Sequence, residues 1–201
     1  MSKKLIFFCF FLVFGFLALF FGLYFKEDIK IFVKEHLYVE TYNLEYSEYV
    51  KEASIEFDVP ESMIYAIIKT ESNFQHDVVS HAGAVGLMQL LPETYSWVAM
   101  KLGENPDMNN ISDPKTNIRY GTYYLAFLSE RLENDETVYA AYNAGFSRVT
   151  GWLSDSRYSD DGKILSKIPY KETKAYVDKV KKARGKYEEI IKKVPASSQI
   201  S

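Results

Sequence analysis

The sequence predicts a mainly α-helical domain that follows one N-terminal transmembrane helix. Three observations predict this class. An unbroken apolar run lies near the N-terminus, most later segments repeat apolar residues every three or four positions, and no segment shows a convincing polar–apolar alternation of the kind that marks a strand. The chain after the apolar run is long enough for one domain with its own hydrophobic core.

The apolar run spans residues 5–25 and contains no charged side chain. A helix of this length reaches roughly 30 Å, enough to cross the hydrocarbon core of a bilayer. Lys3 and Lys4 precede it, and basic residues favour the cytoplasmic side, so we expect residues 1–4 in the cytoplasm and the rest of the chain outside the cell membrane. A cleaved signal peptide is the competing interpretation. The bulky Tyr24 and Phe25 at the end of the run are unsuited to a signal peptidase and favour an uncleaved signal anchor.

After the anchor we expect a stalk at 26–46, one folded domain at 47–191 and a short disordered polar tail at 192–201. The helices predicted in the domain are 49–57, 60–71, 92–102, 113–132, 137–143, 148–153 and one that starts near Tyr170. Pro60 suits the first turn of the second helix, Asp113 suits a cap, and Gly103 and Gly145 suit helix ends. Within 154–167 a small hairpin is an alternative to a loop.

The charge and cysteine content exclude several classes of function. Two of the 24 Lys and Arg residues precede the anchor, which leaves 22 against 27 Asp and Glu, a net charge of −5 for the exported part. This balance excludes a basic nucleic-acid-binding domain. Cys9, the only cysteine, lies inside the apolar run, so the exported part has no disulfide and no cysteine nucleophile. The three histidines lack the spacing of metal ligands. We therefore expect no metal, no other cofactor and a monomer.

One acidic residue continues an apolar stripe of the second helix. Ile64, Ile67, Ile68 and Glu71 stand at i, i+3, i+4 and i+7, so Glu71 falls on the face that should meet the core. Burial and the negative end of the helix dipole both raise the pKa of a carboxyl group, as a general acid near neutral pH requires. Taken alone, this position favours a carboxylate that turns into solvent at the edge of the stripe, and only the motifs around Glu71 favour the buried acid.

Three segments resemble the lytic transglycosylase family of peptidoglycan-cleaving enzymes. The first joins Glu71-Ser72 to Ser80, nine positions after the Glu, and to a Gly-Leu-Met-Gln sequence at 86–89. The second is Ala-Tyr-Asn-Ala-Gly at 141–145, and the third runs from Ile168-Pro169-Tyr170 to Val177. The segment 113–121 also has a familial pattern. The resemblance covers residues 48–190 and implies a goose-type lysozyme-like fold. His81 departs from the family, which commonly has proline there.

The resemblance implies a carbon–oxygen lyase in which Glu71 is the single catalytic acid and base. It cuts the β-1,4 bond between N-acetylmuramic acid and N-acetylglucosamine and leaves a 1,6-anhydromuramoyl end. The residues implied to bind the glycan strand or to shape its site are Ser80, Met88, Gln89, Tyr142, Asn143 and Glu172. Tyr142 is implied to lie beside Glu71. Without the motifs, we would interpret Ser80 and Gln89 as turn or cap residues and Met88 as a core residue. Glu172 would be an acidic residue in the first turn of a helix, where the helix dipole favours it.

Two other functions fit the same fold. A peptidoglycan hydrolase of the goose-type lysozyme kind would use water in place of the sugar hydroxyl, and a catalytically inert wall-binding module would keep only the groove. The pattern around Ser80 and 86–89 favours the transglycosylase branch. The exported part is rich in tyrosine, whose flat apolar face and hydroxyl suit sugar rings. Tyr95, Tyr123, Tyr139 and Tyr170 are the candidates for such contacts.

Overall fold

The computed structural model describes residues 42–193, and the compact unit within them begins at Leu44. The predicted anchor at 5–25, nearly all of the stalk and the residues beyond Lys193 lie outside this range. Among the described residues, no helix has the length and apolar character needed to cross a membrane. The helices are α3 (Ser47–Phe57), α4 (Glu61–Glu71), α5 (Pro92–Lys101), the 3-10 turn η1 (Met108–Asn110), α6 (Pro114–Ser129), α7 (Asp135–Ala144), α8 (Phe146–Leu153) and α9 (Lys171–Lys193).

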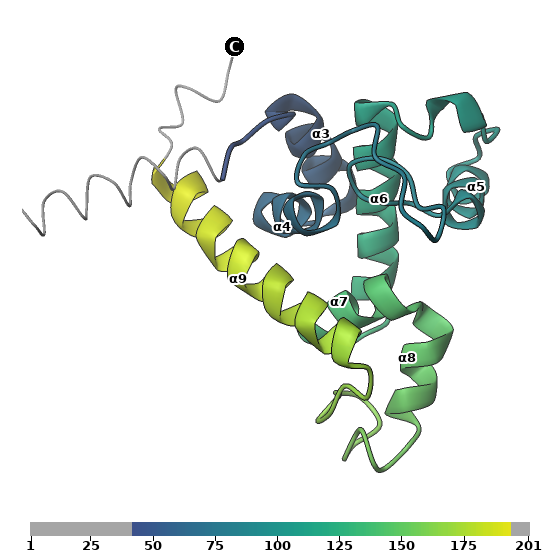
Figure 1. Cartoon of the computed structure of the whole chain (residues 1–201), viewed down its shortest axis with the longest axis vertical. Helices are drawn as coiled ribbons and strands as arrows, with labels where there is room; N and C mark the ends of the chain where they lie inside the picture. Colours follow the sequence, from purple (N-terminus) through teal and green to yellow (C-terminus); the bar gives the residue numbers. More distant parts are fainter. Residues whose placement is uncertain (1–41, 194–201) are drawn as a thin grey trace, which may run out of the picture. The chain divides into compact units, whose positions relative to one another are not determined.

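Helix α6 lies near the middle of the unit and contacts three other helices (Figure 1). α3 and α5 pack on it, and α7 contacts it in turn before leading into α8. Leu125 and Leu128 of α6 are fully buried, as its apolar spacing predicts. The unit is therefore mainly helical, as the sequence predicts, and its β structure within residues 42–193 is limited to isolated bridges that join Val85 to Val79 and to Leu90.

The long helix α9 packs along α4 and α7 (Figure 1). On α4, Ile64, Ile67 and Ile68 are all 0% exposed, and Val177 and Val180 of α9 are equally buried. Each such side chain contributes about 1.5–3 kcal/mol on burial. The apolar stripe that ends at Glu71 thus faces the core, and it carries Glu71 toward α7 and α9.

The helix ends show the local chemistry that the sequence indicates. Asp113 caps α6, because its Oδ1 accepts a hydrogen bond from the Thr116 backbone N–H at 2.9 Å, with Pro114 at the first helical position. Gly145 separates α7 from α8 at φ = 91°, a conformation that glycine adopts without a steric penalty. Gly103 follows the end of α5, also at positive φ.

Several boundaries differ from the sequence-based prediction, most of them by one or two residues, and four of them have a local explanation. Pro60 is the cap residue before α4 rather than part of its first turn. α6 ends at Ser129, before the predicted end at residue 132. Leu132 continues the apolar spacing of the helix, but it lies in the turn that follows and is buried there. α7 begins at Asp135, where the Asn134 side chain caps it. α9 continues through Lys192 and Lys193, which the sequence analysis assigned to the tail. Residues 154–167 form turns rather than a hairpin, held by Ser159 and Asp161.

Candidate active site

Glu71 is the last residue of α4, and its carboxyl group is held between α7 and α9. The side chain is mostly withdrawn from water yet retains partial solvent access. Burial raises the pKa of Glu71 from 4.5 to about 7, against a smaller lowering by a hydrogen bond from Tyr176. The upward direction is the one that the apolar stripe predicts. Near neutral pH this carboxyl group is therefore present in both protonation states and can give or take a proton.

Two tyrosines from different helices surround this carboxyl group. The Tyr176 hydroxyl of α9 donates a hydrogen bond to Glu71 Oε1 at 2.6 Å. The Tyr142 hydroxyl of α7 donates to the Met88 carbonyl oxygen at 2.8 Å. Burial raises the pKa of both phenols well above its usual value, and the nearby charge of Glu71 raises it further. Tyr142 thus lies near Glu71, as the resemblance implies, but the direct hydrogen bond comes from Tyr176, which was not predicted to belong to the site.

The loop at 73–90 follows α4 and carries the Gly-Leu-Met-Gln sequence. Its backbone takes positive φ at Asn73, Phe74 and Gln89 as well as at Gly83 and Gly86. At Gly86, a Cβ would lie 2.5 Å from the Asn117 amide nitrogen, so the close neighbour of this glycine is a side chain of α6. The absence of a side chain at Gly86 lets the loop pack directly on α6.

Asn117 fixes this loop to α6 with two hydrogen bonds and forms a third to Ile111, just before α6. Its Oδ1 accepts from the Met88 backbone N–H at 2.8 Å, and its Nδ2 donates to the carbonyl oxygens of Val85 and Ile111 at 3.0 and 2.7 Å. The side chain is fully buried. Asn117 belongs to the familial segment but had no predicted role. The sequence did contain an indication of this role. Asn117 is a polar residue on the apolar face of α6, just as Glu71 is a polar residue on the apolar face of α4.

The predicted residues of the loop serve mainly its own architecture. Ser80 is partly exposed, and its Oγ accepts from the Ala84 backbone N–H at 3.0 Å. Gln89 uses its Nε2 to donate to the carbonyl oxygens of Val78 and Gly86 at 3.1 and 2.9 Å. The Met88 side chain is 0% exposed and packs on Gly121, whose position has no room for a Cβ. Met88 therefore contacts Tyr142 through its backbone carbonyl oxygen, while its side chain packs against α6 and holds the loop in place.

The remaining predicted residues lie on α7 and α9. Asn143 is exposed and follows Tyr142 directly in the last turn of α7. Glu172 is exposed in the first turn of α9, four residues before Tyr176 and hence one turn away on the same side of the helix. Of the candidate sugar-binding tyrosines, Tyr95 and Tyr139 are buried and unavailable to a ligand, whereas Tyr123 and Tyr170 keep exposed area.

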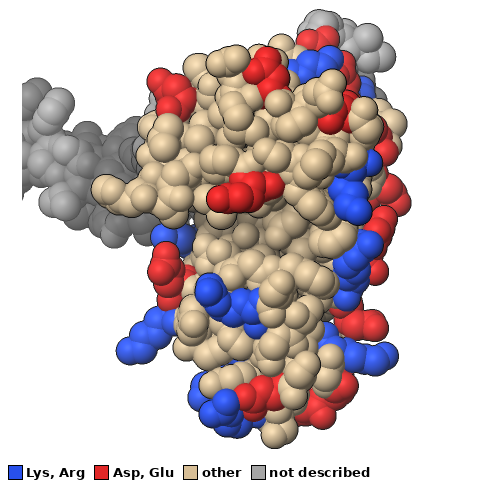
Figure 2. Space-filling view, turned by 90° about the vertical axis from the view of Figure 1, so that its right-hand side faces the viewer, with Lys and Arg blue, Asp and Glu red and all other residues tan. Residues whose placement is uncertain are grey.

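A row of partly exposed aromatic rings leads away from Tyr142. The Tyr142 and Tyr124 ring centroids are 5.5 Å apart, and Trp97 lies 6.1 Å from Tyr124 and 4.7 Å from Phe127. We call Trp97, Tyr123, Tyr124, Phe127, Tyr142 and Phe146 the aromatic row. Figure 2 shows the side of the unit on which α5 and α8 lie. Its middle is largely uncharged: one acidic group lies there, a basic group reaches into it below, and the other charged side chains gather toward its edges. Within residues 42–193, no cluster of His, Cys, Asp and Glu could hold a metal ion.

Known proteins share this sequence and fold. The family description Transglycosylase SLT domain matches residues 48–165. The chain is similar to a soluble lytic murein transglycosylase of Escherichia coli K12, at 35% identity over 146 residues, 70% of this chain and 22% of that protein. A membrane-bound lytic murein transglycosylase C of Haemophilus ducreyi is 32% identical over 177 residues, 75% of this chain and 47% of that protein.

Solved structures agree with these sequence matches. The crystal structure of the 70 kDa soluble lytic transglycosylase from Escherichia coli superposes with a TM-score of 0.68 at 30% identity, covering 77% of this chain and 26% of that one. The same enzyme has been solved in complex with bulgecin A. An inactive mutant of lytic transglycosylase Slt from Pseudomonas aeruginosa gives a TM-score of 0.66 at 30% identity, covering 75% of this chain and 25% of that one. The chain thus spans about a quarter of these solved proteins and about half of the membrane-bound relative.

Proposed function

The chain belongs to the lytic transglycosylase family defined by the Transglycosylase SLT domain, and from that premise we propose that it is a peptidoglycan lytic transglycosylase. It cleaves the β-1,4 bond between N-acetylmuramic acid and N-acetylglucosamine and leaves a 1,6-anhydromuramoyl end. The observation that carries this proposal is the carboxyl group of Glu71, mostly withdrawn from water, with a pKa of about 7 and a hydrogen bond from a tyrosine hydroxyl to its Oε1.

The reaction needs one group that first donates and then accepts a proton. Protonated Glu71 donates its proton to the glycosidic oxygen as the bond from that oxygen to C1 of the muramoyl residue breaks. The resulting carboxylate accepts the proton of the muramoyl C6 hydroxyl, whose oxygen forms the new bond to C1. Glu71 returns to its protonated state and no water is consumed. The nucleophile belongs to the substrate, so holding the sugar in the right geometry supplies much of the rate.

The neighbours of Glu71 have separate roles in this scheme. Tyr176 stabilises the carboxylate that forms after the first proton transfer, because its hydroxyl already donates to Oε1. Tyr142 joins the loop at Met88 to this corner of the site. Ser80 and Asn143, which keep exposed area, and Glu172 at the start of α9 contact the glycan strand. Gln89 and Met88 contribute by shaping the loop, in keeping with their internal contacts.

The product ends test the reaction. The full chain, purified in detergent, is incubated with isolated peptidoglycan, and the released muropeptides are analysed by mass spectrometry. We expect 1,6-anhydro ends from the wild type and none from Glu71→Gln. Reducing ends in place of anhydro ends would instead identify a hydrolase. An inert wild type that still sediments with peptidoglycan would identify a binding module.

We further propose that residues 5–25 anchor the chain in the cell membrane, with the domain on the outer side. The uncharged run after Lys3 and Lys4 supports this topology, and a relative is named as membrane-bound. We expect the chain to stay in the membrane pellet after alkaline carbonate extraction and to be digested by protease added to spheroplasts. Release of the full-length chain by carbonate would contradict the anchor.

A further inference from the structure

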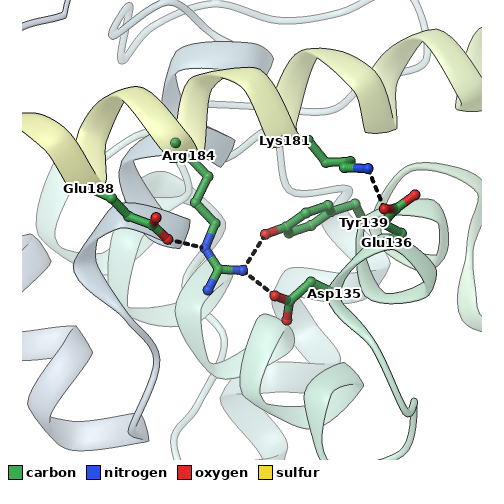
Figure 3. A pocket seen from close by; sticks show the side chains of 7 residues that line it. Asp135, Glu136, Tyr139, Lys181, Arg184 and Glu188 are labelled. Atoms are coloured by element: carbon green, nitrogen blue, oxygen red, sulfur yellow. Dashed lines mark hydrogen bonds and ion pairs between the residues drawn. The ribbon is translucent and has the colours of Figure 1, made fainter.

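A hollow between α7 and α9 contains a network of charged groups centred on Arg184 (Figure 3). The guanidinium group forms an ion pair with Asp135 of α7, and its Nε donates to Glu188 of α9 at 3.1 Å. Its Nη1 also donates to the Tyr139 hydroxyl at 2.8 Å. Arg184 therefore bonds both to the first turn of α7 and to a buried phenol one turn further along that helix.

Arg184 is more enclosed than its partners at the surface. Its side chain is 21% exposed, against 53% for Asp135, and the Tyr139 residue is 1% exposed. Burial raises the pKa of Tyr139 to about 12, while the hydrogen bond from Arg184 acts in the opposite direction. Exposed ion pairs contribute little to stability, but a charged hydrogen bond to a buried phenol restricts geometry more strongly.

The residues of this network share faces with the tyrosines around Glu71. On α7, Asp135, Tyr139 and Tyr142 follow at i, i+4 and i+7. On α9, Tyr176 and Arg184 are separated by eight residues, slightly more than two turns, and Val180 lies between them. Asp135 pairs with Arg184 at one end. At the other end, Glu71 and Tyr142 both lie close enough to Tyr176 to raise the pKa of its phenol, and Glu71 does the same to Tyr142. The two helices are thus antiparallel across this contact.

We infer that Arg184 is a positioning residue of the site: by holding Asp135 and Tyr139 it fixes the register of α7 against α9, and so places Tyr142 and Tyr176 around Glu71. The inference deepens the proposed function and rests on it. Arg184 itself contacts neither Glu71 nor the loop at 73–90 through any bond described here. Its effect passes through helix placement, and a shift of about 1 Å at a reacting group can lower a rate up to a hundredfold.

The test compares four variants of the full chain. Arg184→Gln removes the whole network, and Tyr139→Phe removes the acceptor of its central bond without changing any charge. Tyr176→Phe removes the hydrogen bond to Glu71 and serves as the reference. Lys181→Gln is the matched control, because Lys181 also pairs across the two helices, with Glu136, and carries the same charge. Fluorescence of Trp97 and Trp152, both inside the described unit, confirms that each variant is folded.

Two readouts are used, and one of them needs no activity. The first is kcat and KM on soluble glycan strands. The second is the pKa of Glu71 from its ¹³C carboxyl resonance, assigned with Glu71→Gln. The ionisable groups that act on Glu71 are Tyr176 from α9 and Tyr142 from α7, while Lys69 on its own helix donates to Asn73. Because the Tyr176 hydrogen bond lowers the pKa of Glu71, its loss or distortion raises that pKa.

We expect Arg184→Gln and Tyr139→Phe each to lower kcat by roughly tenfold at unchanged KM and to raise the pKa of Glu71 as Tyr176→Phe does. Lys181→Gln should leave both readouts at wild-type values. The inference fails if folded Arg184→Gln and Tyr139→Phe keep the wild-type pKa and kcat, or if Lys181→Gln changes them equally. Should Arg184→Gln not fold, Tyr139→Phe decides alone. A wild type without anhydro products refutes the proposed function, and the carboxyl titration then still decides the role of Arg184.

Discussion

At the scale of single residues, the site depends on an acid whose burial opposes its ionisation. Glu71 has a pKa of about 7 in the folded chain and about 4.5 when unfolded. Between these values the folded state holds a proton that the unfolded state has released, so stability is greatest below about pH 4.5 and falls as pH rises toward 7. Well above pH 7 the carboxyl group is ionised in both states, and burying its charge lowers the free energy of unfolding by the full amount, of the order of 3 kcal/mol.

We therefore expect Glu71→Gln to be more stable than the wild type at pH 8 and similar to it at pH 4.5. A neutral amide of nearly the same shape removes the desolvation cost of the carboxylate. Urea unfolding at both pH values, followed by tryptophan fluorescence, measures the difference between the two proteins. A difference that is equal at the two pH values would show that the folded-state pKa of Glu71 is not raised.

A second residue-scale prediction concerns Asn117. Asn117→Ala leaves the buried Met88 N–H and the Ile111 carbonyl oxygen without the amide that bonds them, whereas the Val85 carbonyl oxygen keeps the Leu90 N–H. We expect a loss of roughly 2–4 kcal/mol in the free energy of unfolding. Asn109→Ala, which removes only exposed hydrogen bonds near η1, is the control. Equal stability of the two variants would contradict the anchoring role of Asn117.

The sequence identified Glu71, the proposed catalytic residue, but not every residue that contacts it. Glu71 was identifiable because an acid in an apolar stripe is anomalous at short range along one helix. The Tyr176 hydrogen bond joins residues 105 positions apart, and it depends on how α9 packs on α4. Helical periodicity does not define such a packing angle. Ser80 and Gln89 were found by motif spacing, but the spacing could not show that Gln89 directs its amide into its own loop.

At the scale of elements, the existence of each helix follows from apolar spacing and capping residues, while their ends follow from contacts. Leu132 continues the apolar pattern of α6 but is buried from the turn beyond it, which explains the overestimated length of that helix. The isolated β-bridges at Val85 could not be predicted from the sequence, because a single bridged pair produces no alternation of polar and apolar residues. Predictions of site geometry therefore fail first where loops meet helices.

The aromatic row is an element-scale feature with a measurable consequence. Its rings come from α5, α6, α7 and α8, stay partly exposed and begin at Tyr142 beside Glu71. Sugar rings stack on such surfaces, so we expect Trp97→Ala to weaken retention of the Glu71→Gln chain on peptidoglycan by about 1 kcal/mol, or roughly fivefold. Co-sedimentation measures the change. Tyr49→Ala on α3, whose ring stacks with Tyr46, is the control, and equal losses in both variants would contradict the prediction.

At the scale of the whole molecule, net charge does not favour binding to an anionic polymer such as the proposed peptidoglycan substrate. The residues after the apolar run include 22 basic and 27 acidic side chains, a net charge of −5. The face in Figure 2 carries most of its charged groups toward its edges, and only an acidic and a basic group interrupt its middle. Binding by uncharged contacts against like charge should not weaken when salt screens the charges.

We therefore expect retention of Glu71→Gln on peptidoglycan to stay constant or rise between about 50 and about 300 mM NaCl, since the Debye length falls to about 40% of its value and mutual repulsion weakens. Co-sedimentation across this range measures it. The Trp97→Ala derivative should stay weaker at every salt concentration, because its defect lies in the uncharged contacts. A tenfold loss of binding at high salt would mean that Lys and Arg side chains at the edges hold the wall, and the largely uncharged middle would then lose its assigned role.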